Sequence, residues 1–217
     1  MGLTRLTLVR HGETEWNVTM QLQGHSDSSL TKLGRQQVDA AAELLKGRKF
    51  DCLYSSDLRR ATRTSEIINQ YHQLEMKLHN GLRERMFGIM ESLTRNQLKQ
   101  RYPETYKGYM NRIPDFPIPN GESLSDFNYR VISTLQDIAG QNQGKNILII
   151  THGGVLDCVI RHIFSMPLDS PRVYRLYNAS VNSFVIHNNR WLMEEWGVIS
   201  NNEALKPKDE LATLEVK

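Results

Sequence analysis

The eleven residues NILIITHGGVL, Asn146 to Leu156, decide how this 217-residue chain is expected to fold. The run Asn146 to Thr151 is almost wholly apolar, which is typical of a strand buried on both faces of a parallel sheet. The next apolar stretch, Val155 to Phe164, has the length and spacing of a helix. A buried strand that turns directly into a helix indicates a layered α/β fold.

A second segment of the same form opens the chain. Leu3 to Arg10 is predicted to be a strand, and the motif VRHG (residues 9–12) closes it. The later strand closes in THGG (residues 151–154). Because ligands of α/β sheets bind beyond the carboxyl ends of strands, the two His-Gly pairs are predicted to meet in one crevice.

The remaining sequence alternates between strand and helix patterns, which predicts a three-layer sandwich with a mostly parallel central sheet and helices on both faces, in one domain over residues 1–217. Periodicity and capping signals place the other elements as follows: helices over 38–46, 58–71, from 94 and over 124–138, a strand over 50–54, and a hairpin of 181–187 and 190–196 joined at Asn188-Asn189. Four prolines make 102–121 irregular, so an excursion of about 86–121 is expected over the pocket. The polar tail 206–217 is predicted to be loose.

Composition excludes several functional classes. The chain has 27 Lys and Arg against 24 Asp and Glu, a net charge of +3, without the clustered basic stripe of a nucleic-acid binder. No apolar run approaches the roughly 20 residues of a membrane span. Cys52 and Cys158 fit neither a zinc spacing nor a disulfide framework, so a cytoplasmic location is expected.

The paired histidines His11 and His152 suggest chemistry on phosphorus. Neutral imidazole is a nucleophile at neutral pH, and the glycine after each histidine lets a ligand approach closely. One alternative is that both are structural histidines at strand ends. Another is a metal site that also uses His25 and His162, but no zinc spacing is present and arginine beside the site would repel a cation.

Charged residues next to these strands fit the same interpretation. Arg10 and Arg60 could bind phosphate oxygens, because the guanidinium fork matches them, and Ser56 could add a further donor. Glu84 could supply the proton that a leaving alcohol needs. The sequence supports Glu84 weakly, since arginines flank it, and Glu91 and Glu13 are competing candidates.

LVRHGETEWN (residues 8–17) resembles the opening motif of the histidine phosphatase superfamily, which has the phosphoglycerate mutase-like fold. The likeness extends over roughly residues 3–164 through five further blocks in the same order: GHSDSSLTKLGRQQ (24–37), YSSDLRRATRT (54–64), LRERMFGIMES (82–92), PNGESLSDFNYRV (119–131) and ITHGGVL (150–156). Two positions depart from the family pattern. Ser92 follows Glu91 where glycine is common, and Ser29 precedes Leu30 where proline is common.

The resemblance implies a role for each matching residue. His11 would become phosphohistidine, Arg10, Arg60 and His152 would surround the phosphoryl group, and Glu84 would act as acid and then as base. Further contacts to the substrate would come from the polar and glycine positions Asn17, Gln23, Gly24 and Gly153. No metal and no cofactor are expected, because arginines and histidines supply the positive charge.

The expected activity is hydrolysis of a small phosphorylated metabolite. A phosphoglycerate mutase is the alternative, disfavoured here by the short segment after the acid block, and a non-catalytic phosphate-binding module is a third hypothesis. The substrate stays open, since six apolar residues of the excursion could form either an entrance or a core: Met86, Phe87, Ile89, Tyr106, Tyr109 and Met110. A homodimer is one candidate for the oligomeric state.

Overall fold

The computed structural model describes residues 2–187 and 190–205. Its elements are, in chain order, β1 (Thr4–Arg10), α1 (Glu15–Val18), α2 (Lys32–Leu45), β2 (Cys52–Ser55), α3 (Arg59–Asn69), β3 (Met76–Leu78), η1 (Asn80–Leu82), η2 (Gly88–Met90), α4 (Arg95–Arg101), α5 (Pro103–Met110), α6 (Leu124–Gln141), β4 (Asn146–Thr151), α7 (Gly153–Ile163), β5 (Val181–His187), β6 (Arg190–Val198) and η3 (Glu203–Leu205). The predicted turn at Asn188-Asn189 and the predicted loose tail 206–217 lie outside the described residues.

The strands form one six-stranded sheet in the order β3-β2-β4-β1-β5-β6. β1, β2, β3 and β4 run parallel to one another, whereas β5 pairs antiparallel with β1 and forms the predicted antiparallel hairpin with β6 at one edge. β1 lies directly beside β4, with Arg10 opposite Thr151. The predicted meeting of the two His-Gly pairs is therefore confirmed, because both strands end at the same edge of the sheet.

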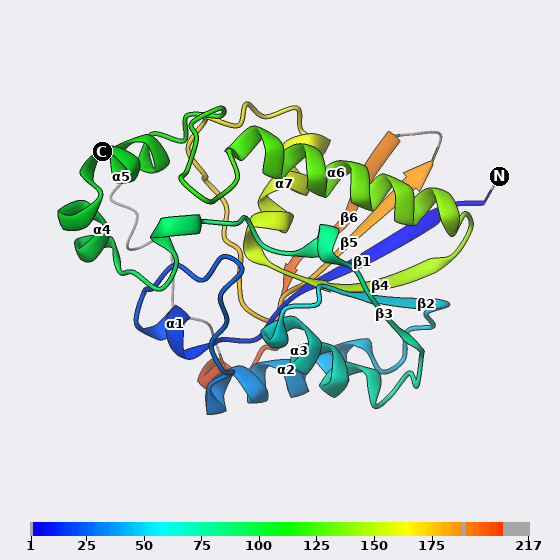
Figure 1. Cartoon of the computed structure of the whole chain (residues 1–217). Helices are drawn as coiled ribbons and strands as arrows, with labels where there is room; N and C mark the ends of the chain where they lie inside the picture. The colour runs from blue at the N-terminus through cyan, green and yellow to red at the C-terminus, as the bar shows by residue number, and fades with distance from the viewer. Residues whose placement is uncertain (1, 188–189, 206–217) are drawn as a thin grey trace.

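Helices cover both faces of this sheet, as the three-layer prediction requires (Figure 1). α6 and α7 pack on one face, where Leu6 and Leu8 contribute to the larger core. α2 and α3 cover the other face, where Val9 contributes to a second core. No helix within the described ranges has the length and apolar character needed to cross a membrane.

Two helices begin earlier than their apolar spacing predicts. α2 begins at Lys32, six residues before Val38, because the hydroxyl of Thr31 accepts a hydrogen bond from the amide of Gly34 and caps the first turn. α7 begins at Gly153 rather than Val155. In both helices the first turn contains polar or small residues, so the spacing of apolar residues does not reveal where the helix begins.

The prediction that 102–121 is irregular is wrong for residues 103–110. Residues 103–110 form α5, with Pro103 in the first turn, where the missing N–H costs nothing. Together with η2 and α4, this helix builds a small separate core of Met90, Leu98 and Ile118, packed against aromatic residues. In Figure 1, α4 and α5 lie beyond the sheet, away from the helices of both layers.

Candidate active site

A cavity of about 260 Å³ lies at the carboxyl ends of β1 and β4. Nearly all of the residues predicted for the site line it: Arg10, His11, Asn17, Gln23, Gly24, Arg60, Glu84 and Gly153. His152 is not a lining residue and is fully buried. The fold therefore gathers residues that are more than 140 positions apart in the chain.

The ring of His11 is fixed by its own backbone neighbour. Nδ1 lies 2.8 Å from the carbonyl oxygen of Gly12, which can only accept, so Nδ1 carries the proton and Nε2 keeps a lone pair. Burial, with the charges of Arg60 and Arg10, holds the pKa of His11 well below its ordinary value. His11 is therefore a neutral imidazole with an unprotonated Nε2.

His152 lies beside His11, with the ring centroids 5.3 Å apart. Its Nε2 lies 2.8 Å from the hydroxyl oxygen of Ser56, while its buried Nδ1 has no hydrogen-bond partner among the described residues. Burial and the charge of Arg60 hold the pKa of His152 well below its ordinary value. Ser56, predicted as an anion donor, instead orients this second histidine.

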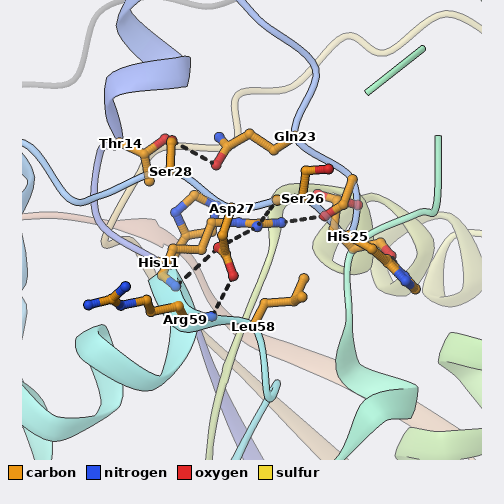
Figure 2. Close-up of polar contacts among 12 residues, drawn as sticks. His11, Thr14, Gln23, His25, Ser26, Asp27, Ser28, Leu58 and Arg59 are labelled. Atoms are coloured by element: carbon orange, nitrogen blue, oxygen red, sulfur yellow. Dashed lines mark hydrogen bonds and ion pairs between the residues drawn. The ribbon is translucent and has the colours of Figure 1, made fainter. Parts of the chain in front are cut away.

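Arg60 is 1% exposed and is held by oxygens of one loop. Its guanidinium donates to the carbonyls of Ser26 and Gly24 at 2.9 and 2.7 Å and to the carboxylate of Asp27 at 2.8 Å. Asp27 also accepts from the backbone amide of Arg59, at the first residue of α3 (Figure 2). This loop thus fixes both the start of α3 and the direction of the Arg60 side chain.

Arg10 closes β1 and donates to the carbonyl of Leu176. A Cβ at Gly153 would come within 3.2 Å of the Arg10 guanidinium. The glycine of the second His-Gly pair therefore leaves room for the arginine of the first.

The carboxylate of Glu84 is oriented by two backbone amides. One oxygen accepts from Arg85 N at 2.8 Å, and the other accepts from Gly154 N at 2.9 Å. A Cβ at Gly154 would lie 2.0 Å from a Glu84 carboxylate oxygen, so only glycine allows this approach. The side chains of the flanking arginines have other partners, since Arg83 pairs with Asp57 at 2.6 Å and Arg85 Nε donates to the carbonyl of Glu122 at 3.1 Å.

The two competing glutamates have structural contacts instead. Glu91 accepts hydrogen bonds from the amides of His25, Ser26 and Phe87 and thereby fastens the loop that holds Arg60. Glu13 accepts from the Thr31 hydroxyl. Neither lines the cavity, so Glu84 is the candidate that reaches it.

The remaining predicted contact residues line the cavity while also supporting its walls. Asn17 Oδ1 accepts from the amide of Thr14 at 3.1 Å and so caps α1. Gln23 Oε1 accepts from the Ser28 hydroxyl at 3.4 Å (Figure 2). Gly24 has a φ of +57°, and a Cβ there would overlap the Glu91 carboxylate.

Comparison with known proteins agrees with this geometry. The profile described as the histidine phosphatase superfamily (branch 1) matches residues 6–199. The chain belongs to this superfamily. It is 38% identical over 203 residues to "Phosphoglycerate mutase-like protein 4" of Arabidopsis thaliana, covering 91% of this chain and 86% of that protein. It is 34% identical to "Probable phosphoglycerate mutase GpmB" of Escherichia fergusonii, covering 90% and 91%.

Solved structures of the superfamily superimpose over most of the chain. The structure titled "Bacillus stearothermophilus YhfR" has a TM-score of 0.85 at 29% identity and covers 94% of this chain and all of that one. An alpha-ribazole phosphatase from Shigella flexneri has a TM-score of 0.82 at 30% identity, covering 89% and 96%. A mycobacterial glucosyl-3-phosphoglycerate phosphatase has a TM-score of 0.78 at 28% identity, covering 89% and 98%. Proteins with these folds include both phosphatases and proteins named as mutases.

The departure from the superfamily pattern at Ser92 has a conformational cost. Ser92 has a φ of +66°, in the left-handed region that glycine adopts without strain. Its amide donates to Leu22 O at 2.8 Å, which ties this strained turn to the loop before the Arg60-binding segment. The common glycine at this position therefore follows from the backbone conformation.

Several cavity residues were not predicted from the sequence. Arginine lines the cavity at four further positions: Arg85, Arg95, Arg112 and Arg172. No spacing signal marked them, because they come from four separate segments. Asn178, which does not line the cavity, was also missed; its side-chain amide donates to the backbone carbonyl of His11 at 3.1 Å.

The apolar residues of the excursion serve both the entrance and the core. Phe87 and Tyr109 line the cavity with their rings 5.6 Å apart and also pack against the small core, as Tyr106 and Ile89 do. Both alternatives for this set are thus partly correct.

Of the four histidines of the alternative metal site, His11 and His152 lie side by side, whereas His25 and His162 have other contacts. The His25 ring bonds to the backbone carbonyl of Glu84, and His162 packs against Trp191. Within residues 2–187 and 190–205, no three His, Cys, Asp or Glu side chains are grouped to hold a metal ion.

Proposed function

We propose that this protein hydrolyses small phosphate monoesters through a phosphohistidine at His11. The observation that carries the proposal is the tautomer of His11, since the bond from Nδ1 to Gly12 O leaves Nε2 unprotonated in a cavity with buried arginines. A neutral, oriented imidazole is what attack on phosphorus requires. The low pKa of His11 keeps it in that form below neutral pH.

The reaction would proceed in two steps. In the first, His11 Nε2 bonds to phosphorus while the ester P–O bond breaks, and protonated Glu84 donates its proton to the leaving alkoxide. In the second, the Glu84 carboxylate takes a proton from water as the water oxygen bonds to phosphorus. The P–N bond then breaks, which releases phosphate and restores neutral His11 and protonated Glu84.

The surrounding charges would stabilise the transferring group. Arg10 and Arg60 would face the phosphoryl oxygens, where fixed donors in a buried site act most strongly. His152, whose ring lies beside that of His11, would add a hydrogen-bond donor to the group. Asn17, Gln23, Gly24 and Gly153 would complete the contacts from the rim of the same cavity.

A phosphoglycerate mutase is the second candidate, because relatives at 34–38% identity carry that name. Chain length does not separate the two activities, since a protein named as a mutase is matched over 91% of its own length. The structures titled as phosphatases, at TM-scores of 0.78–0.82, favour hydrolysis. A non-catalytic module is the least favoured, since all five proposed catalytic residues are present.

The deciding experiment is a panel of phosphomonoesters assayed for phosphate release in excess chelator. A parallel assay follows interconversion of 2- and 3-phosphoglycerate with and without 2,3-bisphosphoglycerate. Release of phosphate with no bisphosphate-dependent interconversion supports the proposal. Rapid interconversion with little phosphate release would instead establish a mutase.

A further inference from the structure

Glu84 lies in a part of the chain that has little regular structure of its own. Residues 81–86, named here the acid turn, comprise the end of η1 and the irregular connection that leads toward η2. A short 3₁₀ turn followed by an irregular segment supplies few internal partners for its carbonyls. The direction of the Glu84 side chain therefore depends on what binds the acid turn from outside.

Arg130 of α6 binds the carbonyl oxygens of the acid turn. Its Nη1 donates to Gly81 O at 2.9 Å and to Arg83 O at 3.1 Å. Its Nη2 donates to Glu84 O at 3.1 Å. One guanidinium thus holds the peptide groups that precede and follow the Cα atom of Glu84.

Glu122, two residues before α6 begins, fixes Arg130 in turn. Its carboxylate accepts from Arg130 Nε at 2.6 Å and from Nη2 at 2.7 Å, the bidentate form of this ion pair. The three carbonyls and both carboxylate oxygens together use all five N–H donors of the guanidinium. Glu122 also accepts from the amide of Met86 at 2.9 Å, so the pair holds the acid turn at both ends.

Arg130 and Glu122 act on the site from outside the cavity. Neither residue lines it, whereas Glu84 and Phe127 do. Arg130 Cζ lies 5.1 Å from the centroid of the Phe127 ring, a cation–π contact. The His25 ring donates to the Glu84 carbonyl at 3.0 Å from a separate loop. Arg130 therefore influences the reaction through the residues that it positions.

We infer that Arg130, held by Glu122, is the positioning residue that aims the carboxyl group of Glu84 at the leaving oxygen of the ester. This inference deepens the proposed function and rests on it for the role of Glu84 as general acid. A proton donor acts within hydrogen-bond reach of the oxygen that it protonates, and a misplacement of about 1 Å can cost roughly 10²-fold in rate. Lysine cannot fully replace Arg130, because it has three donors and no planar fork.

The first test measures kcat/KM for phosphate monoesters that differ in the acidity of the leaving group, since this constant reports the step that breaks the ester bond. In Arg130→Gln, kcat/KM should fall roughly 30-fold for glycerol 3-phosphate but at most about threefold for p-nitrophenyl phosphate, which needs little help from a proton. Arg130→Lys should lie between Arg130→Gln and the wild type. A general structural defect would lower both constants equally.

Arg48→Gln is the matched control. Arg48 is a half-buried arginine that also forms a bidentate pair with a glutamate, since its guanidinium donates to both oxygens of Glu195 at 2.5 and 2.9 Å. Neither residue lines the cavity. This variant should keep the wild-type ratio between the two esters.

Amide hydrogen exchange, followed by NMR, supplies a second readout that does not depend on turnover. The amides of Arg85 and Gly154 bond to the Glu84 carboxylate, so both should exchange roughly tenfold faster in Arg130→Gln, whereas the Leu8 amide in β1 should not change. Faster exchange at these two amides with equal rate losses for both esters, or with no hydrolysis by the wild-type protein, would refute the proposed role of Glu84 and retain its positioning by Arg130.

Two results would overturn the inference. One is unchanged exchange of the Arg85 and Gly154 amides in Arg130→Gln. The other is a rise that extends to the Leu8 amide in both Arg130 variants, because Arg130 would then stabilise the whole fold and not the acid turn in particular.

Discussion

The two halves of the cavity are held in different ways. In the strand-end half, His11 and Arg60 are buried and Glu84 is half-buried, and backbone groups fix all three: Gly12 O holds His11, two amides hold Glu84 and two carbonyls hold Arg60. In the excursion half, Phe87 and Tyr109 belong to a wall with its own small core. The strand-end half belongs to the main sheet. The excursion half packs around its own core, so substitutions there need not disturb the sheet.

This difference assigns separate tasks to the two halves. Phosphoryl chemistry requires atoms held in fixed geometry, which the packed ends of β1 and β4 provide. Selectivity for the rest of the substrate requires side chains that can change between relatives, which a separately packed excursion provides. Substitutions in the first half should therefore change kcat, and those in the second should mainly change KM.

The largest effect is expected for His11→Asn. Loss of the nucleophile should lower kcat by roughly 10⁴-fold and abolish the acid-labile phosphoenzyme, measured by quenched-flow with labelled substrate. His162→Asn is the control, since His162 packs on Trp191 away from the cavity. A His11→Asn protein with near-normal turnover would contradict the assignment of the nucleophile.

Gly154→Ala tests the fixed position of Glu84 without changing its chemistry. The added methyl group would overlap the Glu84 carboxylate, so kcat for alkyl esters should fall by roughly 10²-fold, as expected when a general acid is displaced. The kcat for aryl esters should fall less, because a phenolate leaves with little help from a proton. Gly140→Ala in α6, where nothing lies within 4 Å of the new Cβ, is the matched control.

Equal losses for alkyl and aryl esters in Gly154→Ala would mean that the methyl group disturbs the phosphate site itself. Comparison with Glu84→Gln settles this, since the two variants should show the same difference between ester classes.

Gly108→Ala perturbs the excursion half. The new Cβ would lie 2.4 Å from the Phe116 ring, and repacking the ring should cost about 1–2 kcal/mol of unfolding free energy by urea titration. Tyr109 and the residues after it would shift, so KM should rise several-fold while kcat for p-nitrophenyl phosphate changes little. A loss of kcat as large as that of Gly154→Ala would show that the halves are coupled.

The smallest effect is expected for Ser92→Gly, also in the excursion. Glycine relieves the positive φ of 66° but adds entropy to the unfolded chain, so the net gain should be about 1 kcal/mol, measured as a higher Tm. Kinetic constants should stay within twofold. A lower Tm would mean that the Ser92 side chain contributes contacts that outweigh the strain.

The sequence by itself determined the layered fold and most of the strand-end half. A buried strand carries a continuous apolar run, and chemistry-bearing residues next to such runs are drawn to one edge of the sheet. For this reason His11, His152 and Arg10 could be placed in advance, with β4 beside β1. The sequence did not predict β3 and α1, because elements of three or four residues are too short to show a periodic pattern of apolar residues.

Only the tertiary structure decided between the glutamates and brought further arginines to the cavity. Glu84, Glu91 and Glu13 are equivalent as residue types, and what separates them is which backbone amides and hydroxyls they reach. Arg85, Arg112 and Arg172 come from distant segments with no shared pattern, and solvated surface arginines look the same in a sequence. The burial of Arg85 and the bond from its Nε to the carbonyl of Glu122 exist only in the folded chain, because both depend on which segments pack together.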